Sequence, residues 1–427
     1  NLRFSDGDIN LITYYNSQLT SSAGDDTIIG TAGDDLIDGF GGNDTITGLE
    51  GEDILIGGDG NDVIDGGSGT NRLYGDAGDD TITSAGSFDF VDAGEGTNNV
   101  TLTKNGTAGT FQSGSGDDIY NLQEGYTSRD SNQLNLKSGA GNDTINIDSN
   151  LTGSLFELGD GNDTLNLNKK ISYGTWNEIY GGSGADIFNV TKGSDDNGLL
   201  RLAGDSGNDV FNLTGNNTFV SYAYIFGGDN DDVFNITGKF HGYHNYFYGQ
   251  EGDDVITITG EFNGYPYIYG DDGDDVIKIT ASFTGSAEIS GGNGDDTIDL
   301  SNTTGLTTSK SNVGIRGDNG NDSIIGSDEG NRLIGGENND LLEGKGGNDI
   351  LYGNRHDQKS TNSDNVDIAI YSGTSSDYIV SRASDTTFGY VYYIQDKRDN
   401  SPDGLDTLYE IDNLRFSNGD INLITYY

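Results

Sequence analysis

Aspartate is the residue whose type and spacing suggest chemistry in this chain. Between Ser21 and Thr101 the sequence divides into nonapeptides without a gap, and the sixth position of each is acidic or an amide. A carboxylate is a hard oxygen ligand, and the turn around it supplies further carbonyl oxygens. This register predicts a row of ligands for a hard cation, at Asp26, Asp35, Asp44, Asp53, Asp62, Asp80 and Asp89, with Asn71 and Asn98 in the same register.

The same Gly-Asp motif continues beyond this block at a different spacing. From Ser113 onward it recurs every 20 to 25 residues, so that one motif alternates with an unrelated segment. Nonapeptides then return between Gly317 and Tyr352, where Asn331 interrupts the aspartates. The further candidate ligands are Asp118, Asp143, Asp163, Asp186, Asp209, Asp232, Asp254, Asp275, Asp296, Asp322, Asp340 and Asp349.

The elements that position these aspartates can be inferred from the rest of each nonapeptide. Glycines before the aspartate permit turn conformations with positive φ. The residues after it fit a short strand whose eighth-position side chain points inward, since that position is always aliphatic. Two nonapeptides then form one coil, and stacked coils bury a ladder that no single coil could bury alone. The inward ladder is predicted at Ile28, Ile37, Ile46, Leu55, Ile64, Leu73, Ile82, Val91 and Val100.

These units resemble a known family. The sequences GTAGDDLID from Gly30, GFGGNDTIT from Gly39 and GGDGNDVID from Gly57 are similar to the GGxGxDxUx repeat of RTX (hemolysin-type) proteins. The resemblance implies an all-β fold, a right-handed parallel β-roll or β-solenoid with multiple Ca²⁺ ions between successive turns. Aspartates would line both edges of the roll, and an asparagine keeps one oxygen but loses the charge. Transition metals fit poorly, because there is no Cys and only His241, His244 and His356.

The repeat spacing divides the chain into five segments. Residues 1–20 are interpreted as the tail of a preceding module with a linker, and 21–103 as a nonapeptide β-roll. Residues 104–316 are expected to form a wider solenoid, with coils of about 22 residues and calcium along one edge only. Residues 317–357 form a second nonapeptide roll, and 358–427 a β-rich segment that caps the open end.

Composition excludes several classes of partner. The 427 residues contain 70 Asp and Glu against 21 Lys and Arg, a net charge of −49, which disfavours nucleic acid and anionic membranes. Without cysteine the chain has no disulfide, and no apolar run is long enough to span a membrane. We therefore expect a chain that folds when cations neutralise it. The family resemblance implies type I secretion from a Gram-negative bacterium to the extracellular space or cell surface.

The two ends of the chain are nearly identical. Residues 1–15 read NLRFSDGDINLITYY, and residues 413–427 differ only in having Asn418 in place of Asp6. The two copies are offset by 412 residues, so residues 16–427 read as one complete module. This predicts a parent protein in which copies of the module follow one another in tandem, with self-association into a lattice or fibre.

No catalytic set is recognisable, and we expect no enzyme. The sequence contains neither HExxH nor GxSxG. The tripeptides Asp205-Ser206-Gly207 and Arg316-Gly317-Asp318 fall at the start of Gly-Asp turns, which already explain them. His241 and His244 are interpreted as residues of a solvated edge turn.

The sequence favours a structural module of a surface layer, sheath or filament, but two alternatives stay open. One is a repeat adhesin, in which the aromatic segment from Tyr222 to Phe283 binds glycans or cells. The competing interpretation of that segment is that its aromatic residues fill the wider core. The other alternative is the repeat region of a secreted exoenzyme or toxin. Candidates for stacking on sugars are Tyr243, Tyr246, Tyr265 and Tyr267.

Overall fold

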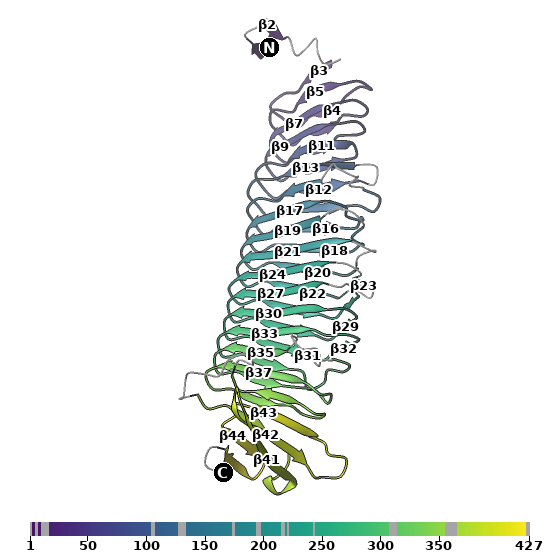
Figure 1. Ribbon diagram of the computed structural model, residues 1–427. Coiled ribbons are helices and arrows are strands. Elements are labelled where there is room, and N and C mark those ends of the chain that lie inside the picture. The colour runs from purple at the N-terminus through teal and green to yellow at the C-terminus, as the bar shows by residue number, and fades with distance from the viewer. Residues whose placement is uncertain are drawn as a thin grey trace. The chain divides into compact units, whose positions relative to one another are not determined.

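The computed structural model divides into two compact units, residues 1–206 (unit 1) and 207–427 (unit 2). Both consist of short strands joined by turns (Figure 1). The described residues are 2–4, 7–9, 17–103, 107–126, 134–172, 176–193, 198–214, 218–219, 222–241, 244–306, 314–354 and 365–423.

Unit 1 is a β-solenoid of two parallel sheets. The chain alternates between them, so each strand pairs with the strand two elements further on. Sheet 1A contains β4 (Thr27–Ile29), β6 (Thr45–Thr47), β8 (Val63–Asp65), β10 (Thr81–Ser84), β12 (Asn99–Leu102), β14 (Ile119–Leu122), β16 (Thr144–Ile147), β18 (Thr164–Leu167) and β20 (Ile187–Val190). Sheet 1B contains β3 (Ser17–Thr20), β5 (Asp35–Asp38), β7 (Ile54–Asp59), β9 (Arg72–Ala77), β11 (Ser87–Asp92), β13 (Thr107–Gln112), β15 (Leu134–Lys137), β17 (Leu155–Asp160), β19 (Trp176–Ser183) and β21 (Leu199–Ser206).

Unit 2 repeats this plan with a small third sheet. Sheet 2A contains β22 (Val210–Leu213), β25 (Val233–Ile236), β28 (Val255–Ile258), β31 (Val276–Ile279), β34 (Thr297–Asp299), β36 (Ser323–Ile325), β38 (Leu341–Glu343), β40 (Ile368–Ile370) and β44 (Asn413–Phe416). Sheet 2B contains β24 (Ala223–Asp229), β27 (Asn245–Glu251), β30 (Pro266–Asp272), β33 (Glu288–Asn293), β35 (Ile315–Asn319), β37 (Arg332–Glu337), β39 (Ile350–Tyr352) and β43 (Leu405–Tyr409). Sheet 2C contains β23 (Thr218–Phe219), β26 (Lys239–Phe240), β29 (Glu261–Phe262) and β32 (Ser282–Phe283).

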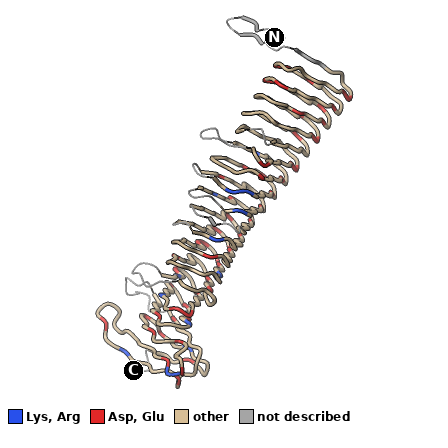
Figure 2. Tube along the Cα trace, turned by 90° about the vertical axis from the view of Figure 1, so that its right-hand side faces the viewer, with Lys and Arg blue, Asp and Glu red and all other residues tan. Residues whose placement is uncertain are grey.

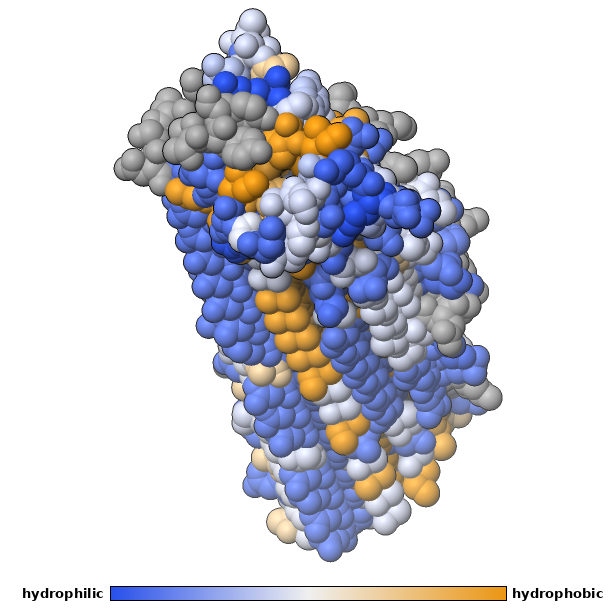
Figure 3. Space-filling view, turned by 90° about the horizontal axis from the view of Figure 1, so that it is seen from below, coloured by the Kyte–Doolittle hydropathy of each residue, from blue (hydrophilic) through white to orange (hydrophobic). Residues whose placement is uncertain are grey.

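The core is a set of ladders in which equivalent residues of successive coils lie opposite one another. Ile46 pairs with Ile64, and Ile64 with Ile82. The predicted inward ladder is fully buried from Ile37 to Val100, whereas Ile28, on the first strand of sheet 1A, is only partly buried. The parallel solenoid that the sequence predicts is therefore confirmed. Figure 3 shows the same stacking at the surface, as columns of like residues.

The coils between the two nonapeptide blocks are wider because each strand of sheets 1A and 2A buries a second residue. Leu122, Ile147 and Leu167 follow the first inward position by two residues and are buried in unit 1. In unit 2 the added width is filled from sheet 2C, where Phe240 stacks on Phe262 with ring centroids 5.1 Å apart. Stacked rings of this kind contribute about 0.5–1.5 kcal/mol beyond the area that they bury.

Antiparallel strands close the C-terminal end of unit 2. β43 pairs in parallel with β39 and in antiparallel orientation with β42 (Gly389–Asp396), which also pairs with β41 (Tyr378–Asp385). In the other sheet β44 pairs with β40 and turns back as β45 (Gly419–Asn422). These strands follow a short 3-10 helix, η1 (Ser375–Asp377), and leave no parallel strand edge open at that end of the described chain.

The two near-identical ends form the same hairpin. At the N-terminus β1 (Leu2–Phe4) and β2 (Gly7–Ile9) pair in antiparallel orientation, with Leu2 opposite Ile9 and Arg3 opposite Asp8. At the C-terminus Leu414 lies opposite Ile421 and Arg415 opposite Asp420, which is the same register shifted by 412 residues.

Candidate metal centre

The sixth-position residues stack into a ladder at the turns that precede sheets 1A and 2A, here called the first ladder. Each residue donates its backbone N–H to a side-chain oxygen of the equivalent residue on the next coil. Asp44 N–H donates to Oδ1 of Asp62 at 2.7 Å, and Asp62 N–H donates to Oδ1 of Asp80 at 2.8 Å. In unit 1 the ladder runs through Asp26, Asp44, Asp62, Asp80, Asn98, Asp118, Asp143, Asp163 and Asp186.

Unit 2 carries the first ladder in the same form. Asp232 N–H donates to Oδ1 of Asp254 at 2.7 Å, and Asp254 N–H to Oδ1 of Asp275 at 2.8 Å. Its members are Asp209, Asp232, Asp254, Asp275, Asp296, Asp322, Asp340, Asp367 and Asp412. Figure 2 shows acidic residues recurring from coil to coil in each unit.

The other carboxylate oxygen, Oδ2, is buried at most of these positions without a hydrogen-bond donor. A buried charged oxygen without a partner destabilises a fold unless a cation or a donor compensates it. The repetition of this feature fits a row of bound cations. The Oδ2 atoms concerned include those of Asp44, Asp62, Asp80 and Asp163 in unit 1 and of Asp232, Asp254, Asp275, Asp296, Asp322 and Asp340 in unit 2.

The first glycine of each repeat leaves room for these oxygens. A Cβ on Gly57 would collide with Oδ2 of Asp62 and with the carbonyl oxygen of Gly75 on the next coil. Gly249 stands in the same relation to Asp254 and to the carbonyl of Gly270. A carboxylate and a main-chain carbonyl therefore face one point between successive coils, where only glycine fits.

This donor set fits calcium. Among the described residues no three Asp, Glu, His or Cys side chains gather into one cluster, so a site combines single carboxylates with main-chain carbonyls. Calcium accepts roughly six to eight oxygens of both kinds in flexible geometry. Bound calcium would supply the positive charge that the buried Oδ2 atoms lack.

Burial makes the ladder carboxyl groups weak acids when no cation is present. It raises the pKa of Asp80 to about 7, of Asp254 to about 7 and of Asp296 to about 8. The N–H donor from the preceding coil lowers each pKa, while nearby aspartates raise it again, and for Asp80 and Asp296 these include neighbours in the ladder. A calcium ion at Oδ2 would oppose burial and keep these groups ionised.

A second ladder occupies the opposite turns in the nonapeptide blocks. In unit 1 it contains Asp35, Asp53, Asn71 and Asp89, and Asn71 accepts the Asp53 N–H at 3.0 Å. In unit 2 it contains Asn331, Asp349 and Asp406. In the wider coils Asp118, Asp143, Asp163 and Asp186 all belong to the first ladder, so one edge alone carries predicted aspartates there.

Three ladder residues were missed by the sequence reasoning. Asp367, Asp406 and Asp412 extend the two ladders into the C-terminal segment, where Asp340 N–H donates to Asp367 Oδ1 at 3.0 Å and Asp349 N–H to Asp406 Oδ1 at 2.9 Å. The signal was incomplete, because only Asp406 lies in a partial motif, Gly404-Leu405-Asp406-Thr407-Leu408, and no nonapeptide surrounds Asp367 or Asp412. All three lie two residues before an inward aliphatic or small residue, such as Leu408 or Ala369.

A further, exposed ladder runs beside the first and was also missed. Here the fifth-position side chain accepts the N–H of its equivalent on the following coil, the reverse of the sixth-position direction. Asn43 N–H donates to Oδ1 of Asp25 at 2.8 Å, and Asn61 N–H to Oδ1 of Asn43 at 2.8 Å. The recurrence of Asp or Asn before the sixth position was a visible signal for this ladder.

Other residues singled out in the sequence lie in turns, in an ion pair or in an aromatic stack. Asp205 and Asp318 occupy turns with φ of 72° and 81°, and Arg316 pairs with Glu288. His244 stacks on Tyr222 with centroids 5.7 Å apart. Tyr243 and His356 lie outside the described residues.

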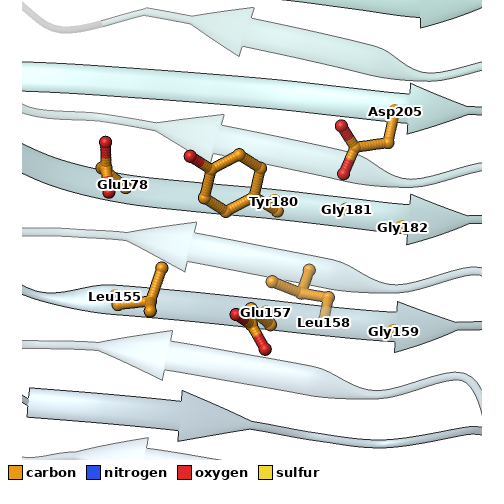
Figure 4. A pocket seen from close by; sticks show the side chains of 9 residues that line it. All are labelled: Leu155, Glu157, Leu158, Gly159, Glu178, Tyr180, Gly181, Gly182 and Asp205. Carbon is orange, nitrogen blue, oxygen red and sulfur yellow. The ribbon is translucent and has the colours of Figure 1, made fainter.

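A surface pocket of about 470 Å³ lies on the outer face of sheet 1B (Figure 4). Glu157, Glu178 and Tyr180 project from β17 and β19, and Asp205 comes from β21. Its nine lining residues include no Ser, Thr, Cys, Lys or His, and its ionisable groups are the carboxylates of Glu157, Glu178 and Asp205 and the Tyr180 hydroxyl. No helix among the described residues is long and apolar enough to cross a membrane.

Comparison with known families identifies the repeats. A family model described as the RTX calcium-binding nonapeptide repeat matches residues 20–55, 47–82, 66–100, 177–196, 284–302 and 316–351. Every predicted ligand from Asp26 to Asp89 lies inside these ranges, whereas Asp367, Asp406 and Asp412 lie beyond them. No curated protein matches the chain.

Among solved structures, the chain is similar to a hyperactive, Ca²⁺-dependent, β-helical antifreeze protein from an Antarctic bacterium. The two are 14% identical, and the match covers 93% of this chain and 94% of that one with a TM-score of 0.31. At that TM-score we draw no functional conclusion from the match.

Proposed function

We propose that this chain, which contains RTX calcium-binding nonapeptide repeats, is a structural module of a tandem-repeat bacterial extracellular protein. The parent protein would be a surface layer, sheath or filament. Calcium would fold and stiffen the module, which would have no catalytic activity of its own.

The observation that carries this proposal is the run of buried, unpartnered carboxylate oxygens along the first ladder. Asp62, Asp80, Asp232 and Asp275 repeat one arrangement from coil to coil, in register with the core beside them. A catalytic site needs one place that differs from the rest, whereas a solenoid is stabilised by the contacts that each coil makes with its neighbours. Repetition with no distinct catalytic constellation among the described residues supports a mechanical role.

The near-identical terminal hairpins support a tandem arrangement. The register that places Arg3 opposite Asp8 also places Arg415 opposite Asp420. The C-terminal copy belongs to the strands that close unit 2, so the N-terminal copy has the sequence and pairing of a module end. Such an array would place the closing strands of one copy before the first coil of the next.

The reason for calcium-triggered folding is electrostatic. A net charge of −49 opposes compaction, and the ladders place carboxylates on consecutive coils. Calcium that binds the folded coils but not the extended chain would stabilise the fold in proportion to the logarithm of its concentration. Export in the unfolded state followed by folding outside the cell follows from this dependence.

Calcium titration followed by microscopy tests the proposal. The chain would be stripped of metal, titrated with calcium, and followed by far-UV circular dichroism and sedimentation. Negative-stain microscopy would then examine the folded product. A change from expanded chain to β-structure, with fibres or sheets, supports the structural role, whereas a lone folded monomer favours the adhesin or exoenzyme alternatives.

The aromatic segment gives limited support to the adhesin alternative. Tyr246 stacks between Tyr224 and Tyr267 on the outer face of sheet 2B, with centroids 4.5 Å away on each side. The ring faces that would stack on a sugar therefore already contact other rings, and the surface presents ring edges and hydroxyl groups. Glycan-array binding that disappears in Tyr246→Ala and Tyr267→Ala would nevertheless favour the adhesin.

A further inference from the structure

We infer that the protein's own hydrogen-bond donors close a defined set of turns to calcium, so that calcium lines one edge of unit 1 even where nonapeptides form two edges. The closed turns are those of Asp26, Asp35, Asn71, Asp89 and Asn98. The turns of Asp44, Asp62 and Asp80 on the first ladder remain open. Unit 2 contains the same kind of closed turn at Asn331.

Hydroxyl groups close three of these turns. Ser22 donates to Asp26 Oδ2 from its N–H at 2.7 Å and from its hydroxyl at 2.8 Å. Thr31 donates to Asp35 Oδ2 in the same way. Asp89 Oδ2 accepts from the Ser84 hydroxyl at 2.6 Å and from the Gly86 N–H at 3.1 Å. The oxygen that stays unpartnered in an open turn is fully hydrogen-bonded here.

The backbone separates open from hydroxyl-closed turns independently of the side chains. In the turns of unit 1 whose aspartate Oδ2 has no donor, those of Asp44, Asp53, Asp62 and Asp80, the second repeat position is left-handed, with φ of 64° at Phe40, 80° at Leu49, 109° at Gly58 and 69° at Asp76. In unit 2 the open turns agree, with left-handed Asp318, Gly336 and Lys345. The second positions of the hydroxyl-closed turns, Ser22, Thr31, Ala85 and Ser327, are not left-handed, whereas the amide-closed turns have left-handed glycines there, Gly67 and Gly94. Non-glycine residues rarely adopt this conformation, so its occurrence at Phe40, Leu49 and Asp76, in turns whose Oδ2 has no donor, indicates a built site.

Amide groups close two more turns. Asn71 keeps its place in the ladder through Oδ1, while its Nδ2 donates to the carbonyl oxygen of Gly66 at 3.0 Å. Asn98 donates from Nδ2 to the carbonyl of Gly96 at 3.2 Å. In both turns the amide hydrogens occupy the place of a cation, because their partial positive charge lies against a turn carbonyl oxygen.

The second ladder of unit 1 is therefore held by protein hydrogen bonds. Asp35 and Asp89 are satisfied by hydroxyl and N–H donors, and Asn71 by its own amide. Asp53 alone has an unpartnered Oδ2, and the Gly66 carbonyl that faces it already accepts the Asn71 amide. Two edges that look alike in the repeat register would thus differ in calcium content.

Counting bound calcium in matched variants tests this inference. Calcium per chain would be measured by native mass spectrometry and by atomic emission after desalting. Asp62→Asn should lower the count by at least one, whereas Asp35→Asn and Asp89→Asn should leave it unchanged. Asn71→Asp should raise the count, since Gly67 is already left-handed with φ of 70°. Asn331 shows that asparagine is tolerated in a hydroxyl-closed turn, where its Oδ1 accepts the Ser327 N–H.

An equal loss of calcium in Asp35→Asn or Asp89→Asn and in Asp62→Asn would overturn the inference. Circular dichroism would first establish that each variant is folded. A crystal of the unaltered chain gives a test without variants, since anomalous scattering should place calcium beside Asp44, Asp62 and Asp80. A calcium peak beside Asp35 or Asp89 would contradict the closed turns. None of these outcomes depends on whether the parent protein is a filament or an adhesin.

Discussion

Asp62 donates its backbone N–H to Oδ1 of Asp80 at 2.8 Å, and Oδ2 of the same Asp80 is buried without a donor. One carboxylate thus joins two coils with one oxygen and presents the other to the space between coils. Since Asp80 in turn donates to Asn98 at 2.9 Å, the arrangement is propagated from coil to coil. Coil stacking and cation binding are therefore coupled through single side chains.

The metal-free chain should be most stable at acidic pH. Burial raises the pKa of Asp80 and Asp143 to about 7 and of Asp232 and Asp275 to about 8, above their ordinary 3.8. A raised folded-state pKa means that the fold binds protons more tightly than the unfolded chain. The resulting stability is present in full below about pH 4 and is lost as pH rises through 7 to 8.

Calcium should reverse this dependence, because protons compete with it for the same carboxylates. The measurement is the melting temperature between pH 4 and 9, in protein stripped of metal on a chelating resin and in saturating calcium. Repeating the metal-free series in 1 M salt screens the exposed charges and leaves the effect of burial. Parallel curves with and without calcium would contradict the coupling.

Gly57→Ala should abolish one calcium site. The new Cβ would collide with Asp62 Oδ2 and with the Gly75 carbonyl, and overpacking of this kind destabilises by about 1–3 kcal/mol. Gly24→Ala is a matched control, because a Cβ there meets only the Ser22 hydroxyl oxygen, 4.0 Å away. Urea unfolding in saturating calcium measures both variants. Equal destabilisation would mean that the first glycine acts through chain flexibility rather than through space for oxygen ligands.

The fold could be predicted because each coil repeats a small set of requirements. Ile46, Leu55 and Ile64 are fully buried at the position that the nonapeptide register assigns to the core. An apolar residue at the same position of every nonapeptide places equivalent strands of successive coils side by side in the same direction. The parallel stack could therefore be predicted from the sequence alone. Ile28 is only partly buried because its strand has a neighbour on one side only.

The candidate site could be predicted less completely, because an aspartate occupies the sixth repeat position in both open and closed turns. Asp35 and Asp53 occupy the same repeat position, and the difference lies in Thr31 against Leu49 four residues earlier. A hydroxyl at the second position is visible in the sequence, but the backbone conformation that goes with it is not. Asp406 was missed because the fold brings it to Asp349 from 57 residues away.

The aromatic segment shows why the two interpretations from sequence could not be separated. Alternation along a strand sends neighbouring residues to opposite faces. Phe247 is fully buried in the core, whereas Tyr246 and Tyr248 lie part-buried on the outer face. Filling of the core and formation of an outer aromatic surface therefore occur together.

Arg398 should be required for the closing strands of unit 2. Its Nη2 donates to Asp396 Oδ2 at 2.7 Å and to Asp403 Oδ2 at 2.9 Å, and both carboxylates are buried. Arg398→Leu leaves two buried carboxylates without their cationic partner, which should destabilise by about 3–5 kcal/mol. The control is Arg415→Leu, whose partner Asp420 lies 3.3 Å away in an exposed pair that should contribute less than about 1 kcal/mol. Thermal unfolding in saturating calcium should separate the two, and equal melting temperatures would show that the buried pair is not needed.

Tyr246 should stabilise unit 2 through ring stacking. It contacts Tyr224 and Tyr267 with interplanar angles of 17° and 9°, and each such pair contributes about 0.5–1.5 kcal/mol beyond area burial. Tyr246→Ala should therefore destabilise the fold by about 1–3 kcal/mol. Tyr393→Ala, on the exposed face of β42, should change stability by less than about 1 kcal/mol. Chemical unfolding of both variants gives the comparison. If Tyr246→Ala left stability unchanged but removed fibres or glycan binding, the stack would instead be a contact surface, and its place on sheet 2B would have a functional explanation.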